Sequence, residues 1–178
     1  PIRIFHSPKN YPMIHRLSCY LSLCLLALTA SGEVPGIHLA DKSLGVEFLD
    51  SEEKEFFISQ TMDLSGRLFV GCREALYVYE PTADGGFGLR QELYRFPKDS
   101  WLYDLEVYGN DLFVLTNTAL YRMGDAVTRR NNLKPEKLLW GQPQGHFHQG
   151  LHGMEFGPTG DLFLSMGDPQ PHMHWDRS

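Results

Sequence analysis

The sequence contains little cysteine. Of the three cysteines in its 178 residues, Cys19 and Cys24 lie in an N-terminal apolar run, and only Cys72 lies beyond it. A single remaining cysteine excludes a disulfide framework in the main part of the chain. No CxxCH sequence is present, so a covalently attached haem is excluded as well.

Basic residues are also few. The first 32 residues contain three basic residues and no acid, and the remainder contains 13 basic and 22 acidic residues, a net charge of −9. Because binding to phosphate backbones needs clustered cations, we do not expect nucleic acid as a partner. The content of 42% hydrophobic and 21% charged residues is typical of a folded domain rather than a disordered chain.

The sequence has no long hydrophobic run, because the apolar stretch Leu17–Ala30 has only 14 residues and is short for a membrane span. Arg16 precedes this stretch and Ala30-Ser31-Gly32 ends it, which predicts a signal peptide at 13–32 and a mature start at Glu33. The protein is therefore expected to be secreted or periplasmic, and membrane-attached only if the signal stays uncleaved. Residues 1–12 precede this signal, so we interpret them as a misassigned or partial upstream segment.

Beyond the signal, the sequence repeats one short theme three times. The copies are "GRLFV" at 66–70, "NDLFV" at 110–114 and "GDLFL" at 160–164, and each follows a turn sequence. In the first two copies an "ALY" run follows with its leucine eight residues after that of the first run, and a further apolar run completes the unit. Leu, Phe, Val and Tyr alternating with polar residues between Gly, Asn, Asp and Pro are typical of β-strands.

These units predict an all-β fold made of β-propeller blades. Each unit has four short strands in roughly 45 residues, and independent hairpins would not explain the matched offsets. The first unit covers about 57–97, the second about 101–141, and the third starts near Gly150. We therefore expect a lead-in segment at 33–56 and a partial propeller at 57–178, with about two and a half four-stranded blades of a six-bladed ring.

The third unit carries a cluster of histidines at the expected ligand-binding end. Aligning "LHGMEF" (151–156) with "LYDLEV" (102–107) places it on the innermost strand, which faces the central channel of a propeller. His148 then lies on the loop entering the strand, and His152 lies at its start. After this hairpin the expected "ALY" strand is replaced by "GDPQPHMHWDRS", and such a departure from a repeat is typical of a functional site.

Two kinds of chemistry fit this cluster. A zinc or copper site would need His146, His148 and His152 to converge, and no HExxH pattern supports it. A general base needs one imidazole and a carboxylate that orients it. His148 or His152 supplies the imidazole, and Asp168 supplies the carboxylate at the end of the next strand. We favour the general base and interpret His146 as an exposed turn residue.

The stretch "HQGLHGMEFGPTGDLFLSMGD" (148–168) resembles the motif of the soluble quinoprotein glucose dehydrogenase and sorbosone dehydrogenase group. The resemblance implies a six-bladed propeller that binds pyrroloquinoline quinone over the channel and oxidises a sugar or alcohol hydroxyl. It further implies a catalytic histidine, either His148 or His152, oriented by Asp168. Gln149 is implied as a contact of the quinone, and a cytochrome c as an electron acceptor.

A second function remains open, because the same fold also serves as a binding module. In that alternative the propeller holds a carbohydrate or a protein partner on its channel face and performs no redox chemistry. Basic residues on later channel loops, or a downstream CxxCH, would favour the enzyme.

Overall fold

The computed structural model describes residues 2–6, 44–49, 56–129, 131–141 and 150–167, and its regular elements in these ranges are all β-strands. The chain divides into two compact units, residues 1–52 and 53–178. In the first unit β1 (Ile2–His6) pairs antiparallel with β2 (Leu44–Phe48), so the segment expected as a lead-in contains a strand. The described part of the chain contains no helix that could span a bilayer.

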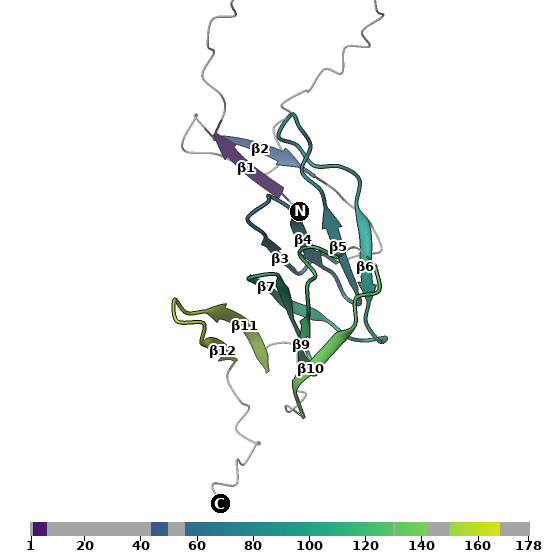
Figure 1. Ribbon diagram of the computed structural model, residues 1–178, viewed down its shortest axis with the longest axis vertical. Helices are drawn as coiled ribbons and strands as arrows, with labels where there is room; N and C mark the ends of the chain where they lie inside the picture. The colour runs from purple at the N-terminus through teal and green to yellow at the C-terminus, as the bar shows by residue number, and fades with distance from the viewer. Residues whose placement is uncertain (1, 7–43, 50–55, 130, 142–149, 168–178) are drawn as a thin grey trace, which may run out of the picture. The chain divides into compact units, whose positions relative to one another are not determined.

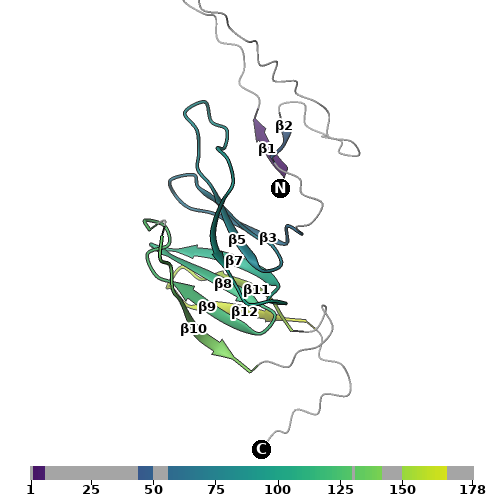
Figure 2. The same cartoon turned by 90° about the vertical axis from the view of Figure 1, so that its right-hand side faces the viewer.

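The second unit consists of antiparallel sheets in which each strand pairs with its neighbours in the sequence (Figures 1 and 2). The first sheet contains, in spatial order, β3 (Ser59–Met62), β4 (Leu68–Gly71), β5 (Ala75–Tyr79) and β6 (Gln91–Arg95). The second contains β7 (Leu102–Tyr108), β8 (Asp111–Thr116), β9 (Ala119–Met123) and β10 (Pro135–Trp140). The third contains β11 (Leu151–Phe156) and β12 (Leu162–Met166).

This architecture confirms the predicted all-β fold with propeller blades. Two four-stranded blades are complete, and the described residues of the third blade form its first two strands. The predicted unit boundaries agree with the sheets, because the first blade ends at Arg95 and the second begins at Leu102. We name these sheets blade 1, blade 2 and blade 3.

The turn before the second strand of each blade explains why the repeated theme begins there. Gly66 and Gly160 occupy this turn in blades 1 and 3 with φ of 85° and 86°, a left-handed conformation that glycine adopts without steric cost. In blade 1 the carboxylate of Asp63 accepts hydrogen bonds from the backbone of Ser65 at 2.8 Å and of Arg67 at 3.0 Å. These local bonds fix the hairpin and the register of the strands that follow.

Apolar side chains from consecutive blades form the core. One cluster joins blades 1 and 2 and includes Phe69, Leu102 and Leu105, which are almost completely buried. A second cluster joins blades 2 and 3 through Leu115 and Met154. Strand β7 contacts both β3 and β11, so the innermost strands of successive blades lie next to one another (Figure 1).

Candidate functional site at the innermost strands

The innermost strands of blades 2 and 3 share a local irregularity at one end. The pairing of β7 with β8 shifts between Leu102 and Asp104, and that of β11 with β12 shifts between Leu151 and Gly153. Tyr103 and His152 are therefore the extra residues of two β-bulges at equivalent positions of the repeat. A bulge re-aims the side chain at that position and is common beside functional sites.

The two bulged side chains meet. The ring centroids of Tyr103 and His152 are 5.4 Å apart, and the ring planes are tilted by 42°. Burial raises the pKa of the Tyr103 hydroxyl, so this group stays protonated at neutral pH. The Nε2 atom of His152 is buried and has no hydrogen-bond partner within the described part of the chain. An unpaired buried polar atom costs about 1–3 kcal/mol, which makes His152 a candidate for a functional role.

Asp104, the residue after Tyr103, connects blade 2 to blade 3. Its Oδ2 accepts a hydrogen bond from the backbone N–H of Met154 at 2.6 Å, across 50 positions of sequence. Its Oδ1 accepts a bond from the N–H of Leu105 at 2.9 Å. Because Met154 lies two residues after His152, the carboxylate fixes the backbone that carries the imidazole.

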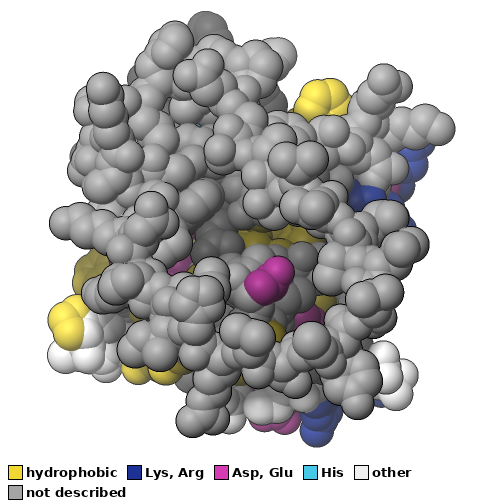
Figure 3. All heavy atoms as spheres, turned by 90° about the horizontal axis from the view of Figure 1, so that it is seen from above, with side chains coloured by type: hydrophobic (Ala, Val, Ile, Leu, Met, Phe, Trp, Pro, Cys, Tyr) yellow, Lys and Arg dark blue, Asp and Glu magenta, His cyan; other side chains and the backbone are white. Residues whose placement is uncertain are grey.

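The charged side chains of β7 and β11 are all acidic: Asp104, Glu106 and Glu155. Burial raises the pKa of Asp104, against two backbone hydrogen bonds that lower it, and the nearby Glu155 raises it further. Burial also raises the pKa of Glu106, with smaller contributions from the charges of Glu155 and Asp104. The innermost strands therefore form an acidic lining. Figure 3 shows one face of the molecule, on which Asp and Glu side chains of described residues are visible at several places.

Most of the residues predicted from the sequence lie outside the described ranges. These are His146, His148, Gln149 and Asp168, so the geometry of the predicted base and its orienting carboxylate stays a prediction. The described hairpin has the expected course, because β11 and β12 are antiparallel and the N–H of Gly167 donates to the carbonyl of Gly150 at 2.8 Å. Among the residues that the structure describes, no group of three potential metal ligands comes together.

The sequence prediction missed Tyr103 and Asp104 as parts of this site. The alignment of "LYDLEV" with "LHGMEF" already contained the signal, since it places Tyr103 and His152 at equivalent positions of the repeat. Recognising the contact requires the bulges, which re-aim both side chains. The acidic lining follows the same alignment, because Glu106 and Glu155 occupy equivalent positions.

Comparisons with known proteins identify similar folds at low sequence identity. No family model matches the chain, and no curated protein matches its sequence. A catalytically inactive virginiamycin B lyase from Staphylococcus aureus, crystallised with quinupristin, is similar over 67% of this chain, with 15% identity and a TM-score of 0.48. A selenomethionine-substituted virginiamycin B lyase from the same organism gives 64%, 16% and 0.41. The chain spans only 37% and 38% of the length of these two proteins.

Proposed function

We propose that this chain is part of a β-propeller enzyme that oxidises a sugar or alcohol hydroxyl, with His152 or His148 as the general base. The observation that supports His152 is its buried Nε2 atom, which lacks a partner in the described residues and lies at the start of an innermost strand. An imidazole in this position would accept the hydroxyl proton, and a two-electron acceptor bound beside the substrate would have to take the hydride from the same carbon.

The described neighbours of His152 have supporting roles in this proposal. Tyr103 packs against the imidazole and restricts its orientation. Asp104 holds the β11 backbone through the N–H of Met154. The predicted orienting carboxylate, Asp168, would then act on the other side of the hairpin. A base held by neighbouring groups needs little reorganisation when the proton moves, which is what general catalysis requires.

The described residues do not fit the cofactor that the resemblance implies. Pyrroloquinoline quinone carries carboxylates, which need Arg or Lys partners, whereas β7 and β11 carry only the acids Asp104, Glu106 and Glu155. The exposed side chain of Arg73 packs against Phe56 and Trp101, with its guanidinium 4.6 Å from the Trp101 ring centroid. We therefore derive no step through the quinone.

The acidic lining favours a second candidate function, a propeller that binds a hydroxyl-rich or cationic ligand without redox chemistry. Carboxylates such as Asp104 and Glu106 accept hydrogen bonds from hydroxyl and ammonium groups. An aromatic ring such as Tyr103 offers an apolar face for the C–H face of a sugar ring. This candidate needs neither the quinone nor a cytochrome c.

Turnover measurements on the full chain separate the two functions. We expect sugar or alcohol oxidation with an artificial electron acceptor, measured with and without added quinone. If His152 is the base, His152→Ala lowers turnover by about a hundredfold or more, and a matched His146→Ala control leaves it unchanged. His148→Ala and Asp168→Asn test the other predicted residues in the same way. Wild-type protein that oxidises nothing across the panel, yet binds a sugar in calorimetry, would replace the enzyme by the binding module.

A further inference from the structure

Arg73 lies in the turn between β4 and β5, at the end of blade 1 where the innermost strand begins. The N–H of Leu102, the first residue of β7, donates to the carbonyl of Cys72 at 3.3 Å, which brings this turn beside the entry to blade 2. Tyr103 follows Leu102, and its ring contacts His152. Arg73 therefore lies at the same end of the blades as the candidate site.

Two aromatic rings pack on the guanidinium of Arg73 from two successive blades. Its Cζ atom lies 4.6 Å from the ring centroid of Trp101 and 5.5 Å from that of Phe56. Both rings belong to segments that enter innermost strands, Phe56 before β3 and Trp101 directly before β7. Such stacking occupies the faces of a planar guanidinium and leaves the N–H groups at its edge available for hydrogen bonds.

The backbone that carries the Trp101 ring is fixed by Asn117 in the turn between β8 and β9. The N–H of Trp101 donates to Oδ1 of Asn117 at 3.2 Å, and the N–H of Asn117 donates to the carbonyl of Trp101 at 3.0 Å. The Nδ2 atom of Asn117 also donates to the carbonyl of Asp99 at 3.0 Å. The surface on which Arg73 packs is therefore held in place, so the guanidinium loses little freedom when it binds a ligand.

Among the residues that the structure describes, no acid forms an ion pair with Arg73, although the next residue is Glu74. The Oε1 atom of Glu74 instead accepts the N–H of Asp99 at 2.9 Å. Four other described arginines do form ion pairs with acids: Arg67, Arg95, Arg122 and Arg129. The edge of the Arg73 guanidinium is thus open to an external anion, and its planar fork matches a carboxylate, which it binds with two parallel hydrogen bonds.

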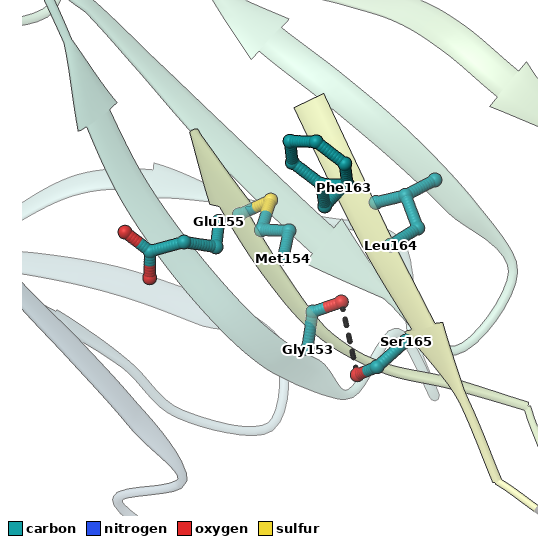
Figure 4. Close-up of a pocket in the computed structure, with 6 residues that line it drawn as sticks. All are labelled: Gly153, Met154, Glu155, Phe163, Leu164 and Ser165. Carbon is teal, nitrogen blue, oxygen red and sulfur yellow. Dashed lines mark hydrogen bonds between the residues drawn. The ribbon is translucent and has the colours of Figure 1, made fainter. Parts of the chain in front are cut away.

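The rest of the candidate site disfavours an anion. The charged side chains of β7 and β11 are the acids Asp104, Glu106 and Glu155. Of the residues that line an open hollow of 260 Å³ on blade 3, Glu155 alone is charged (Figure 4). Like charges repel, whereas carboxylates accept hydrogen bonds from hydroxyl groups. A ligand that carries both an acid group and hydroxyls is therefore oriented with its acid group at Arg73 and its hydroxyls along the acidic lining.

We propose that Arg73, stacked on Phe56 and Trp101, is a subsite for the carboxylate of a sugar acid of the uronic acid class. This inference rests on the proposed function, because it names the class of hydroxyl compound that the site takes. The guanidinium binds the carboxylate through its N–H edge, and the ring of Phe56, which is 60% exposed, offers an apolar surface to the sugar. A neutral sugar of the same shape lacks the charge-assisted hydrogen bonds and binds more weakly.

Calorimetry on the full chain tests the subsite with matched ligands. Glucuronate, galacturonate and mannuronate are each titrated beside their methyl esters, which have the same ring without the charge. We expect at least one uronate to bind about tenfold more tightly than its ester, because only the acid forms charge-assisted hydrogen bonds. Added salt should reduce this preference, since exposed charges are screened. Equal affinities within every pair, or no binding of any of these ligands, would overturn the proposal.

Variants of the cation show whether Arg73 is responsible. Arg73→Gln removes the charge from an exposed side chain and should reduce the affinity for the uronate to that for its ester. Arg73→Lys keeps the charge and should restore only part of the affinity, because an ammonium group cannot form the paired contact. Arg129→Gln is the matched control, because it removes an exposed guanidinium from the connection between β9 and β10, and should bind like wild type. A uronate preference that persists in Arg73→Gln contradicts the proposal.

Turnover measurements separate this inference from the proposed function. If the enzyme oxidises the uronate, Arg73→Gln should raise KM about tenfold and leave kcat nearly unchanged, which is the result of losing uniform binding. Uronate binding that depends on Arg73, without any oxidation, removes the enzyme and retains the subsite. Oxidation of neutral sugars with no preference for acids retains the enzyme and removes the subsite.

The carboxylates of pyrroloquinoline quinone are a second source of the same ligand chemistry. Quinone and uronate are therefore titrated separately with wild type and with Arg73→Gln. We expect the variant to lose affinity for the uronate and to keep whatever affinity wild type has for the quinone. Loss of quinone affinity with unchanged uronate affinity would assign Arg73 to the cofactor and overturn the proposal.

Discussion

Replacement of Asp104 by alanine tests whether one carboxylate holds blades 2 and 3 together. The change removes the acceptor of the Met154 N–H, and an unpaired N–H in this partly buried place costs about 1–3 kcal/mol. Removing the carboxylate also has a stabilising effect that offsets part of this loss. Asp104 is half-buried near Glu106 and Glu155, and both burial and these neighbours disfavour its charge in the folded protein. We expect a net loss of about 1–2 kcal/mol in the free energy of unfolding at pH 7.

The effect of this replacement should depend on pH. The pKa of Asp104 is raised in the folded protein, so the folded state binds the proton more tightly than the unfolded chain. Its contribution to stability is complete below the unfolded pKa of about 4 and declines as the pH rises through the folded pKa. The difference between wild type and Asp104→Ala should therefore be larger near pH 4 than at pH 7.

Urea unfolding of the full chain, followed by tryptophan fluorescence, measures both effects. With a slope of about 2 kcal/mol/M, the midpoint of Asp104→Ala should fall by about 0.5–1 M at pH 7. Glu106→Gln is the matched control, because it removes a charge from the same lining without losing a side-chain hydrogen bond within the described residues. Its midpoint should stay unchanged or rise. An Asp104→Ala midpoint equal to that of wild type at both pH values would refute the link between the blades.

The remaining predictions concern the core, a turn and the N-terminus. Leu105→Ala, which creates a cavity between blades 1 and 2, should cost about 2–5 kcal/mol in the same unfolding assay. Asp63→Ala should cost about 2–4 kcal/mol, because it removes the 2.7 Å ion pair with the buried Arg67 and two backbone hydrogen bonds. The pKa of Asp63 is lowered in the folded protein, so its contribution to stability is complete above about pH 4 and is lost as the pH falls through the folded pKa. Measuring the free energy of unfolding at a series of acidic pH values would show this loss. N-terminal sequencing of exported protein should begin at Glu33, and a mature chain that retains residues 17–30 would contradict the signal peptide.

The sequence predicts the blades well because their determinants are local. The turn before β4, β8 or β12 and the alternating apolar residues after it act within about ten positions, so the repeats are visible without a structure. The eight-residue offset between Leu68 and Leu76 is likewise the length of a short strand and its turn. Matched offsets in two units were therefore sufficient to predict the sheet order.

The site was less predictable because its contacts join residues far apart in the sequence. The bond from Met154 to Asp104 spans 50 positions and exists only after two blades dock. The bulge at His152 adds one residue between Leu151 and Gly153, and no residue type in this stretch requires it. A carboxylate in an alternating strand also resembles an ordinary exposed acid until the neighbouring blade buries it.

The sequential pairing of strands has a consequence for how the chain folds during synthesis. Every strand of blades 1 and 2 forms its backbone ladder only with strands adjacent to it in the sequence, so the pairing within each sheet requires no residue outside its own unit. Ribosomes add about 5–20 residues per second, so one unit of roughly 45 residues emerges in about 2–9 s, long compared with the microseconds in which a hairpin forms. Each blade therefore has time to pair its strands before the next emerges, and Leu102 and Leu105 of β7 meet a preformed surface on blade 1.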